Sequence, residues 1–539
     1  QQHAAISGCL HVDKDCLIMP YKRVEVSRPR GINIDLSPYE LPNEIWSEGN
    51  NINFSNHRTN KALGYSQVFT APAVQPIIAM PWTDYNLPYW FYASETKVYR
   101  TDGNTNVNVT RQTAGVDVDY TGDYDAGWTG TTFNGALILN NRTDAPQFFN
   151  SSSSKMEDLT AWPTSWTTGV VRPFKNYLIA LDIQDDTGTS FPSMVKWSDA
   201  APLGGIPASW DPVNPAVQAG YNILPDTAGR CIEGKSLNDT FFIYKSDAVW
   251  AMQFIGGNFI FSFRKVFSDD TGILSRDCVT EFDGKHFVVG VSDIYVHDGT
   301  SKKSVIANKM AKSFYSQINP EHVDKVKCVS DVLNKEIWVY FPTADSVDGR
   351  ANKALVWNWE VDAWAQRDIV NISYIATGVI ADTTDTTDTW DSDTSGWNTD
   401  TSGWGEERFN PASKSLFLVS YDDSLFYKGN TGLSINGSTY FAHVERIGID
   451  FGDDKGYKYI NSITPHIVGE GTVNVYVGTE QQQGSGIAWS QPQAFNVDSD
   501  YKVNFRQSGR YIGVRFESAS DDAWSLTGYT IEYSHEGQQ

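Results

Sequence analysis

One phrase of residues recurs along most of the chain, and it constrains the fold more than any other feature. Each copy has an apolar strand, a short polar turn, and a second strand that carries an aromatic residue and often ends at Asp-Gly. Clear copies lie at 89–93 with 97–103, at 285–290 with 294–299, and at 415–419 with 425–429. Six or seven copies follow one another at intervals of about 40 to 60 residues. A degenerate repeat of antiparallel hairpins with this period predicts a β-propeller.

The physical reason for a ring is the burial of sheet faces. One four-stranded sheet cannot bury both faces alone, whereas a ring of sheets buries each face against a neighbour and protects the edges. We therefore expect residues 31–435 to form an irregular propeller of six or seven blades with loop insertions. The alternative is a set of unrelated hairpins in two β-sandwiches.

The two ends of the chain differ from this repeat. Residues 1–30 have no clear period and are expected to form an arm or docking segment. Residues 438–539 contain short strand patterns separated by turn residues at even intervals, which predicts a separate antiparallel β-sandwich. Aromatic residues make up 13% of the chain and charged residues only 20%, a composition that excludes a helical bundle and wholesale disorder. The expected class is all-β.

A stretch at 382–405 is nearly pure Asp, Thr, Ser, Gly and Trp, with Trp390, Trp397 and Trp404 spaced by seven residues. We expect an exposed loop that a partner orders, or a hairpin with stacked indoles. Its segment from Asp391 resembles the opening of a calcium loop. Calcium loops end on a bidentate Glu at the twelfth position, and Ser402 stands there instead. The sequence therefore favours a solvated loop without metal.

The charge of the chain limits its partners. It carries 42 Lys and Arg against 65 Asp and Glu, a formal charge of −23. Holding DNA by phosphate neutralisation needs the opposite balance. Phosphate-binding loops and the nucleophile elbow of hydrolases are absent from the sequence. The nine histidines form no metal-binding pair, and His286 and His297 are expected on adjacent strands of one blade, in a structural role. We predict no enzyme, no cofactor, and no catalytic, cofactor-binding or metal-binding residue.

The cysteines indicate a reducing environment. Five occur, with long spacings and no C-x-x-C pair, and we expect reduced, mostly buried thiols; they are Cys9, Cys16, Cys231, Cys278 and Cys328. The segment 6–9 has the outline of a lipid-attachment box but follows no apolar stretch, so no membrane anchor is expected. No apolar run approaches the roughly 18 residues of a membrane span.

Two segments carry a resemblance to a known family. The first runs from Asp35-Leu-Ser-Pro-Tyr39 through Asn50-Asn51-Ile-Asn53-Phe54 to Lys61-Ala-Leu-Gly64-Tyr65. The second is the closing unit, with Val444-Glu445-Arg446, Ser508-Gly509-Arg510-Tyr511 and Trp524-Ser-Leu-Thr-Gly528-Tyr529. Both resemble structural proteins of short-tailed bacteriophages, the tail hub or nozzle group called tail tubular protein B-like. The Trp-Asp-Ser-rich insertion is also similar to that group. Where the family tends to have Arg-Phe-Arg-Asp-Gly, this chain has Asn53-Phe-Ser-Asn-His57.

The resemblance implies a virion protein with a β-propeller body, made in the host cytoplasm and assembled as a ring of six at the distal end of the tail. It implies that the ring seals the channel before infection and conducts the genome out afterwards, without specific DNA binding. The implied partners are a ring-shaped tail adaptor and tail fibres or a tail needle. An acidic lumen would repel phosphates and let the duplex slide.

Two other functions stay open at this point. The chain could be a phage or bacterial surface protein that binds or depolymerises host polysaccharide, with Trp-rich loops as the stacking surface. It could also be a secreted propeller with an unknown partner, although an odd number of cysteines argues mildly against secretion.

Overall fold

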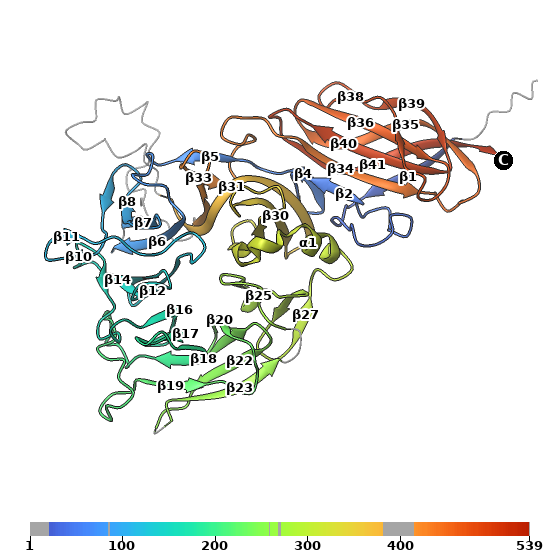
Figure 1. Ribbon diagram of the computed structural model, residues 1–539. Helices are drawn as coiled ribbons and strands as arrows, with labels where there is room; N and C mark the ends of the chain where they lie inside the picture. The colour runs from blue at the N-terminus through green and yellow to red at the C-terminus, as the bar shows by residue number, and fades with distance from the viewer. Residues whose placement is uncertain (1–20, 85–86, 258, 268–270, 381–413, 538–539) are drawn as a thin grey trace, which may run out of the picture.

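Strands account for nearly all regular structure in the computed structural model, which describes residues 21–84, 87–257, 259–267, 271–380 and 414–537 (Figure 1). Every pair of neighbouring strands is antiparallel, and the helical segments described are α1 (Ala311–Gln317) and a 3-10 turn at Pro320–Lys325. The protein is all-β, as the sequence predicts.

Five four-stranded sheets follow one another along the chain, each a meander of consecutive strands. Apolar strands joined by short turns fold this way because each new strand pairs with the one before it. The sheets are β6 (Ile78–Asp84), β7 (Leu87–Ala93), β8 (Val98–Thr101) and β9 (Asn106–Asn108); β12 (Thr129–Phe133), β13 (Ala136–Asn140), β14 (Gln147–Phe149) and β15 (Glu157–Asp158); β16 (Thr167–Phe174), β17 (Tyr177–Gln184), β18 (Ser190–Trp197) and β19 (Gly220–Ile223); β20 (Cys231–Leu237), β21 (Thr240–Lys245), β22 (Val249–Phe254) and β23 (Phe261–Phe267); and β24 (Val279–Phe282), β25 (Lys285–Val289), β26 (Ile294–His297) and β27 (Lys302–Ser304). A small hairpin joins β10 (Gln112–Thr113) to β11 (Val116–Asp117).

A seven-stranded sheet follows, and its central strand has two partners in succession. The first part of β31 pairs with β30, and the part after a register shift between Ile372 and Tyr374 pairs with β32. The last strand in this sheet is β5, which precedes all the others in sequence and pairs with β33. The strands are β28 (Lys327–Asp331), β29 (Glu336–Phe341), β30 (Ala351–Asn358), β31 (Ala363–Val379), β32 (Lys414–Ser420), β33 (Phe426–Gly429) and β5 (Tyr65–Val68).

These sheets, which we call the body, surround a common cavity. Its lining comes from the first strands β6, β12, β16, β20, β24 and β28 and from the second part of β31. Each of these strands contacts the next, and β31 contacts β6, so the series closes on itself. Figure 1 shows the sheets following one another in a ring.

Two six-stranded sheets form a terminal unit beside the body. Their buried residues, among them Val475, Phe516 and Tyr529, belong to one hydrophobic cluster. One sheet contains β3 (Ile52–Ser55), β4 (Arg58–Lys61), β41 (Trp524–Gly537), β35 (Tyr457–Gly469), β39 (Val503–Gly509) and β1 (Lys22–Ser27). The other contains β2 (Glu48–Asn50), β34 (Ala442–Ile449), β40 (Tyr511–Ser518), β36 (Thr472–Glu480), β37 (Ala488–Trp489) and β38 (Gln493–Asn496).

The N-terminal strands β1, β2 and β4 therefore hydrogen-bond to C-terminal strands and β3 pairs with β4, although the sequence pattern groups 1–30 as an arm and 31–435 as one body. Strand β1 pairs with β41 over its whole length, and β2 pairs with β34. The reason is burial: Ile52 and Phe54 alternate with more exposed neighbours and pack into the hydrophobic cluster that the terminal unit shares with the body.

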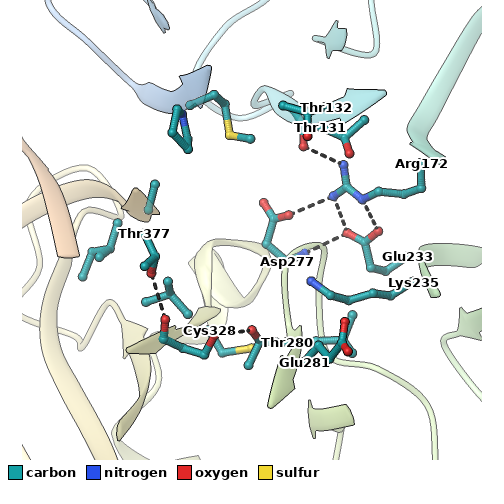
Figure 2. Close-up of a pocket in the computed structure, with 18 of the residues that line it drawn as sticks. Thr131, Thr132, Arg172, Glu233, Lys235, Asp277, Thr280, Glu281, Cys328 and Thr377 are labelled. Carbon is teal, nitrogen blue, oxygen red and sulfur yellow. Dashed lines mark hydrogen bonds and ion pairs between the residues drawn. The ribbon is translucent and has the colours of Figure 1, made fainter. Parts of the chain in front are cut away.

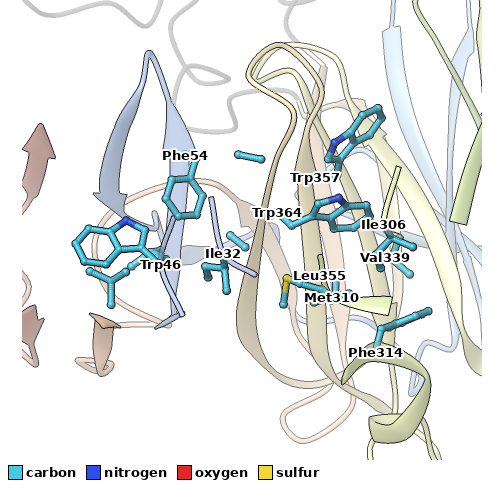
Figure 3. Close-up of a cluster of buried hydrophobic side chains, with 14 of the residues drawn as sticks. Ile32, Trp46, Phe54, Ile306, Met310, Phe314, Val339, Leu355, Trp357 and Trp364 are labelled. Carbon is cyan, nitrogen blue, oxygen red and sulfur yellow. The ribbon is translucent and has the colours of Figure 1, made fainter. Parts of the chain in front are cut away.

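The same segment joins the terminal unit to the body (Figure 3). Trp46 and Phe54 lie on one side of the junction and Trp364 on the other, in one continuous cluster. The backbone N–H of Ile32 donates to the carbonyl of Trp364 at 3.3 Å. The indole N–H of Trp46 donates to Thr59 at 2.9 Å, which satisfies its polar atom inside the cluster. The junction is thus a packed core and not a flexible tether.

Candidate site in the central cavity

The central cavity measures about 480 Å³ and is lined by both polar and apolar side chains (Figure 2). Its most distinctive feature is a group of charged residues that come from different sheets and meet at one wall. They are Arg172 on β16, Glu233 on β20 and Asp277 just before β24, and Asp277 also pairs with Lys327 at the start of β28. These residues are far apart in sequence, and the packing of each first strand against the next brings them together.

Arg172 is the centre of this group. Its Nε and Nη2 atoms donate to the two carboxylate oxygens of Glu233, each at 2.8 Å. Nη2 also donates to Asp277 at 2.9 Å, and Nη1 donates to the carbonyl of Gly130 at 3.1 Å. A planar guanidinium suits this geometry because its donors form a fixed fork. The side chain of Glu233 is only 2% exposed, so this is a buried ion pair.

Asp277 links this pair to Lys327. The Lys327 ammonium lies 3.2 Å from the second carboxylate oxygen of Asp277 and 4.6 Å from the ring centre of Tyr374. Burial raises the pKa of Asp277, but the charges of Lys327 and Arg172 outweigh burial and lower that pKa to about 2. Two cations and two anions thus neutralise one another. None of these four charges is free to act as an acid or base on a bound molecule.

A second buried network joins the fourth and fifth sheets without any charge. His286 and His297 lie directly opposite each other on β25 and β26, which confirms their predicted adjacency. The hydroxyl of Tyr244 lies 2.6 Å from Nδ1 of His286 and 2.7 Å from Nε2 of His297. Burial lowers the pKa of His286 to about 3 and the pKa of His297 to about 4, so both rings are neutral at pH 7.

The neighbouring groups fix the direction of every proton in this network. The N–H of Gly299 donates to Nδ1 of His297 at 3.1 Å, so Nε2 carries that ring's proton and donates to Tyr244. Tyr244 then donates to His286, whose Nε2–H donates to the carbonyl of Ser236 at 3.0 Å. The Tyr244 hydroxyl and all four ring nitrogens of this hydrogen-bond network have partners, which indicates a structural role.

The other residues singled out in the sequence are spread through the molecule. Cys231, Cys278 and Cys328 are buried free thiols, as predicted, and burial raises the pKa of Cys231 and Cys278 to about 12. Cys9, Cys16, the 6–9 segment and the insertion with its calcium-like residues Asp391 and Ser402 lie outside the described residues. Within the described ranges, His, Cys, Asp and Glu form no group of three or more that could hold a metal.

The sequence patterns did not point to the charged residues of the cavity. A usable signal existed, since Arg172 follows Val170-Val171 and Glu233 follows Cys231-Ile232, each on the first strand of its sheet. A charge inside a predicted buried strand needs a partner, but the sequence does not say which residue supplies it.

Comparisons with known proteins add little to this picture. No family model matches the chain, and no curated protein matches it. Among solved structures it is similar to a computationally designed protein, Ika8, with a TM-score of 0.35 and 9% identity over 68% of this chain and 100% of that one. It is similar to the AfRom2 CNH domain to the same TM-score of 0.35, with 7% identity over 68% of this chain and 97% of the other. In the part of the chain that the structure describes, no helix has the length and apolar character needed to span a membrane.

Proposed function

We propose that the chain is a seven-bladed β-propeller with an appended β-sandwich and that it is the structural subunit of the tail hub or nozzle of a short-tailed phage. The closed series of first strands around one cavity supports the propeller. Strand β5 supplies the outermost strand of the last blade, so the start and end of the series are joined by hydrogen bonds. The two six-stranded sheets with a shared core support the sandwich.

The single observation that carries a structural role is the ion-pair network at the wall of the cavity. Arg172, Glu233, Asp277 and Lys327 are all paired, and the pairs tie together strands of neighbouring blades. Two further charged residues, Lys235 and Glu281, line the cavity outside this network. The network stiffens the body, which suits a part that must bear load.

The size of the cavity decides where a passage would run. At about 480 Å³ the cavity falls in the range of small-molecule pockets and is far too small to admit a DNA duplex. A channel would therefore lie between copies of the chain and not through the centre of one propeller. Head-to-tail contacts between identical copies generate a closed ring, and six copies would frame the passage.

Charge supports a conduit that does not hold DNA. The chain carries a formal charge of −23, which a ring would multiply around its lumen. Phosphates are repelled by such a wall and the duplex slides. In this proposal the ring sits on the tail adaptor, contacts tail fibres or a tail needle, seals the channel before infection, and opens for genome ejection. Its place is the virion.

Electron microscopy and mass photometry of the full chain, alone and mixed with the tail adaptor, test the proposal. We expect six-fold rings with a central hole, at least in the presence of the adaptor. A chain that stays monomeric at micromolar concentration with the adaptor present would refute it. A map of the assembled ring would also give the potential of the lumen, and a strongly basic lumen would refute the conduit mechanism.

A further inference from the structure

A second cavity, of about 560 Å³, lies on the third sheet and shares no residue with the central cavity. Its floor is formed by the last two strands of that sheet, β18 and β19. Met194 pairs with Ile223 and Lys196 pairs with Tyr221, and directly opposite residues present their side chains on one face. Its walls come from the loops around 161–166 and 210–212. We call it the lateral pocket.

Aromatic rings surround the lateral pocket. Trp210 is 1% exposed and Trp166 is half-buried, whereas Tyr221 is 52% exposed at the entrance. Phe191 completes this lining from β18. Flat aromatic faces with a few polar groups between them are typical of ligand pockets. Such faces also stack well against the C–H face of a sugar ring.

A buried ammonium supplies hydrogen-bond donors to this pocket. Lys196 is only 2% exposed, and its Nζ atom donates to the carbonyl of Trp210 at 2.8 Å. Its other close contact is the ring of Trp166, whose centre lies 5.4 Å away. An ammonium has three donors, and the described residues accept from one of them. Burial lowers the pKa of Lys196 to about 8, and the charge of Asp211 opposes this shift. At pH 7 the ammonium is therefore charged, with two donors left for a ligand.

Two carboxylates supply acceptors. One oxygen of Asp185 accepts from the backbone of Thr187 and Thr189, and one oxygen of Asp211 accepts from the backbone of Val213. Their second oxygens have no partner among the described residues. Hydrogen bonds from Thr187 lower the pKa of Asp185, so this carboxylate is ionised at neutral pH.

The mixture of groups selects the class of ligand. An anion would meet two carboxylates, and a cation would meet the Lys196 ammonium, so both are disfavoured. A neutral hydroxylated ring can accept from Lys196, donate to Asp185 and Asp211, and stack on Trp166. We propose that the lateral pocket binds one glycosyl unit of a neutral saccharide. This site is additional to the conduit role and does not depend on it.

The test is a binding measurement on the full chain with defined sugars. The probes are maltotriose, cellotriose, chitotriose and a mannotriose, with trigalacturonic acid as the charged comparison, measured by isothermal titration calorimetry and saturation-transfer NMR. We expect at least one neutral trisaccharide to bind. Lys196→Met should weaken that binding by about 10-fold or more, because a charge-assisted hydrogen bond is lost.

Asp211→Asn is the second variant, because Asp211 is exposed and Asn keeps the oxygen that accepts from Val213. It should weaken binding while the melting temperature stays unchanged, which separates a binding role from a folding role. Tyr501→Ala is the matched control, since Tyr501 is 78% exposed and lies in the terminal unit.

Binding of none of the neutral sugars, equal binding by Asp211→Asn, or preference for trigalacturonic acid would overturn the proposal. Ring formation by the same variants, followed by electron microscopy, reports separately on the conduit role.

Discussion

Arg172 and Glu233 form a two-bonded ion pair across the boundary between the third and fourth sheets, with both N···O distances at 2.8 Å. Each residue sits on the first strand of its sheet. The pair therefore joins neighbouring sheets at the cavity, and substitutions at either residue test how much it contributes to the rigidity of the body.

Glu233→Gln should lower the free energy of unfolding by about 3 kcal/mol, because Arg172 is left as a buried charge with half its compensation. Thermal unfolding followed by calorimetry measures the change. The control is Arg23→Met, which breaks a pair with Glu532 in which Arg23 is 73% exposed. That control should cost less than about 1 kcal/mol. Equal effects in both variants would contradict a special role for the cavity pair.

Tyr244→Phe should be strongly destabilising for its size, although it removes a single oxygen. The change leaves Nδ1 of His286 and Nε2 of His297 buried without their partner. Each such orphan costs about 1–3 kcal/mol. Tyr295→Phe is the control, because its hydroxyl serves one acceptor, the carbonyl of Thr271. We expect the Tyr244 variant to melt at a clearly lower temperature than the Tyr295 variant.

Stability should fall in acid, and the two histidines set the window. Their folded pKa values of about 3 and 4 lie below the ordinary value of 6.5, so the unfolded chain binds protons first as pH falls. This contribution to stability is therefore fully present above pH 6.5 and is lost as pH falls through 4 toward 3. For His297 the loss reaches about 3 kcal/mol at the acid end. Urea unfolding of His297→Gln at several pH values should show a shallower decline than the unchanged protein.

Asp277 should add a second loss of folding stability at lower pH. Its folded pKa of about 2 lies below the ordinary value of 3.8, so its contribution is present above pH 3.8 and disappears as pH falls through 2. Asp277→Asn should remove this part of the decline of stability in acid and should lower stability at pH 7. The same slope of stability against pH below pH 3.8 in both proteins would contradict the contribution of Asp277.

Residues 438–537 alone should not fold, because four strands of the terminal unit come from the start of the chain. Without them β34 loses β2 and β41 loses β1 and β4, and the strand edges this exposes promote aggregation. A fusion of residues 21–64 to 438–537 through a flexible linker is the matched control and should give dispersed NMR signals. A soluble, folded 438–537 fragment would show that the N-terminal strands are accessory.

The sequence could predict contacts between residues close in the chain but not contacts between distant segments. The all-β class, the hairpins, and the meeting of His286 with His297 follow from alternation and turn residues over a few positions. The pairing of Tyr65 with Gly429, or of Val26 with Tyr529, depends on register between segments hundreds of residues apart. No local pattern encodes such a partner. The same limit hid the cavity network, where Arg172 meets Asp277 from another sheet.

Strand β5 has a mechanical consequence. Residues 62–64 lead to it from the terminal unit, and residues 430–441 lead back from β33, so both connections leave the body beside the paired residues Tyr65 and Gly429. Tension between the two parts would therefore pull β5 and β33 from the same end and in the same direction, so it loads the ladder between β33 and β32 and does not separate β5 from β33. The two connections also hold each other, because Gly64 N–H donates to Gly432 and Tyr65 N–H donates to Ser434, and the apolar junction around Trp46 and Trp364 carries part of the same load.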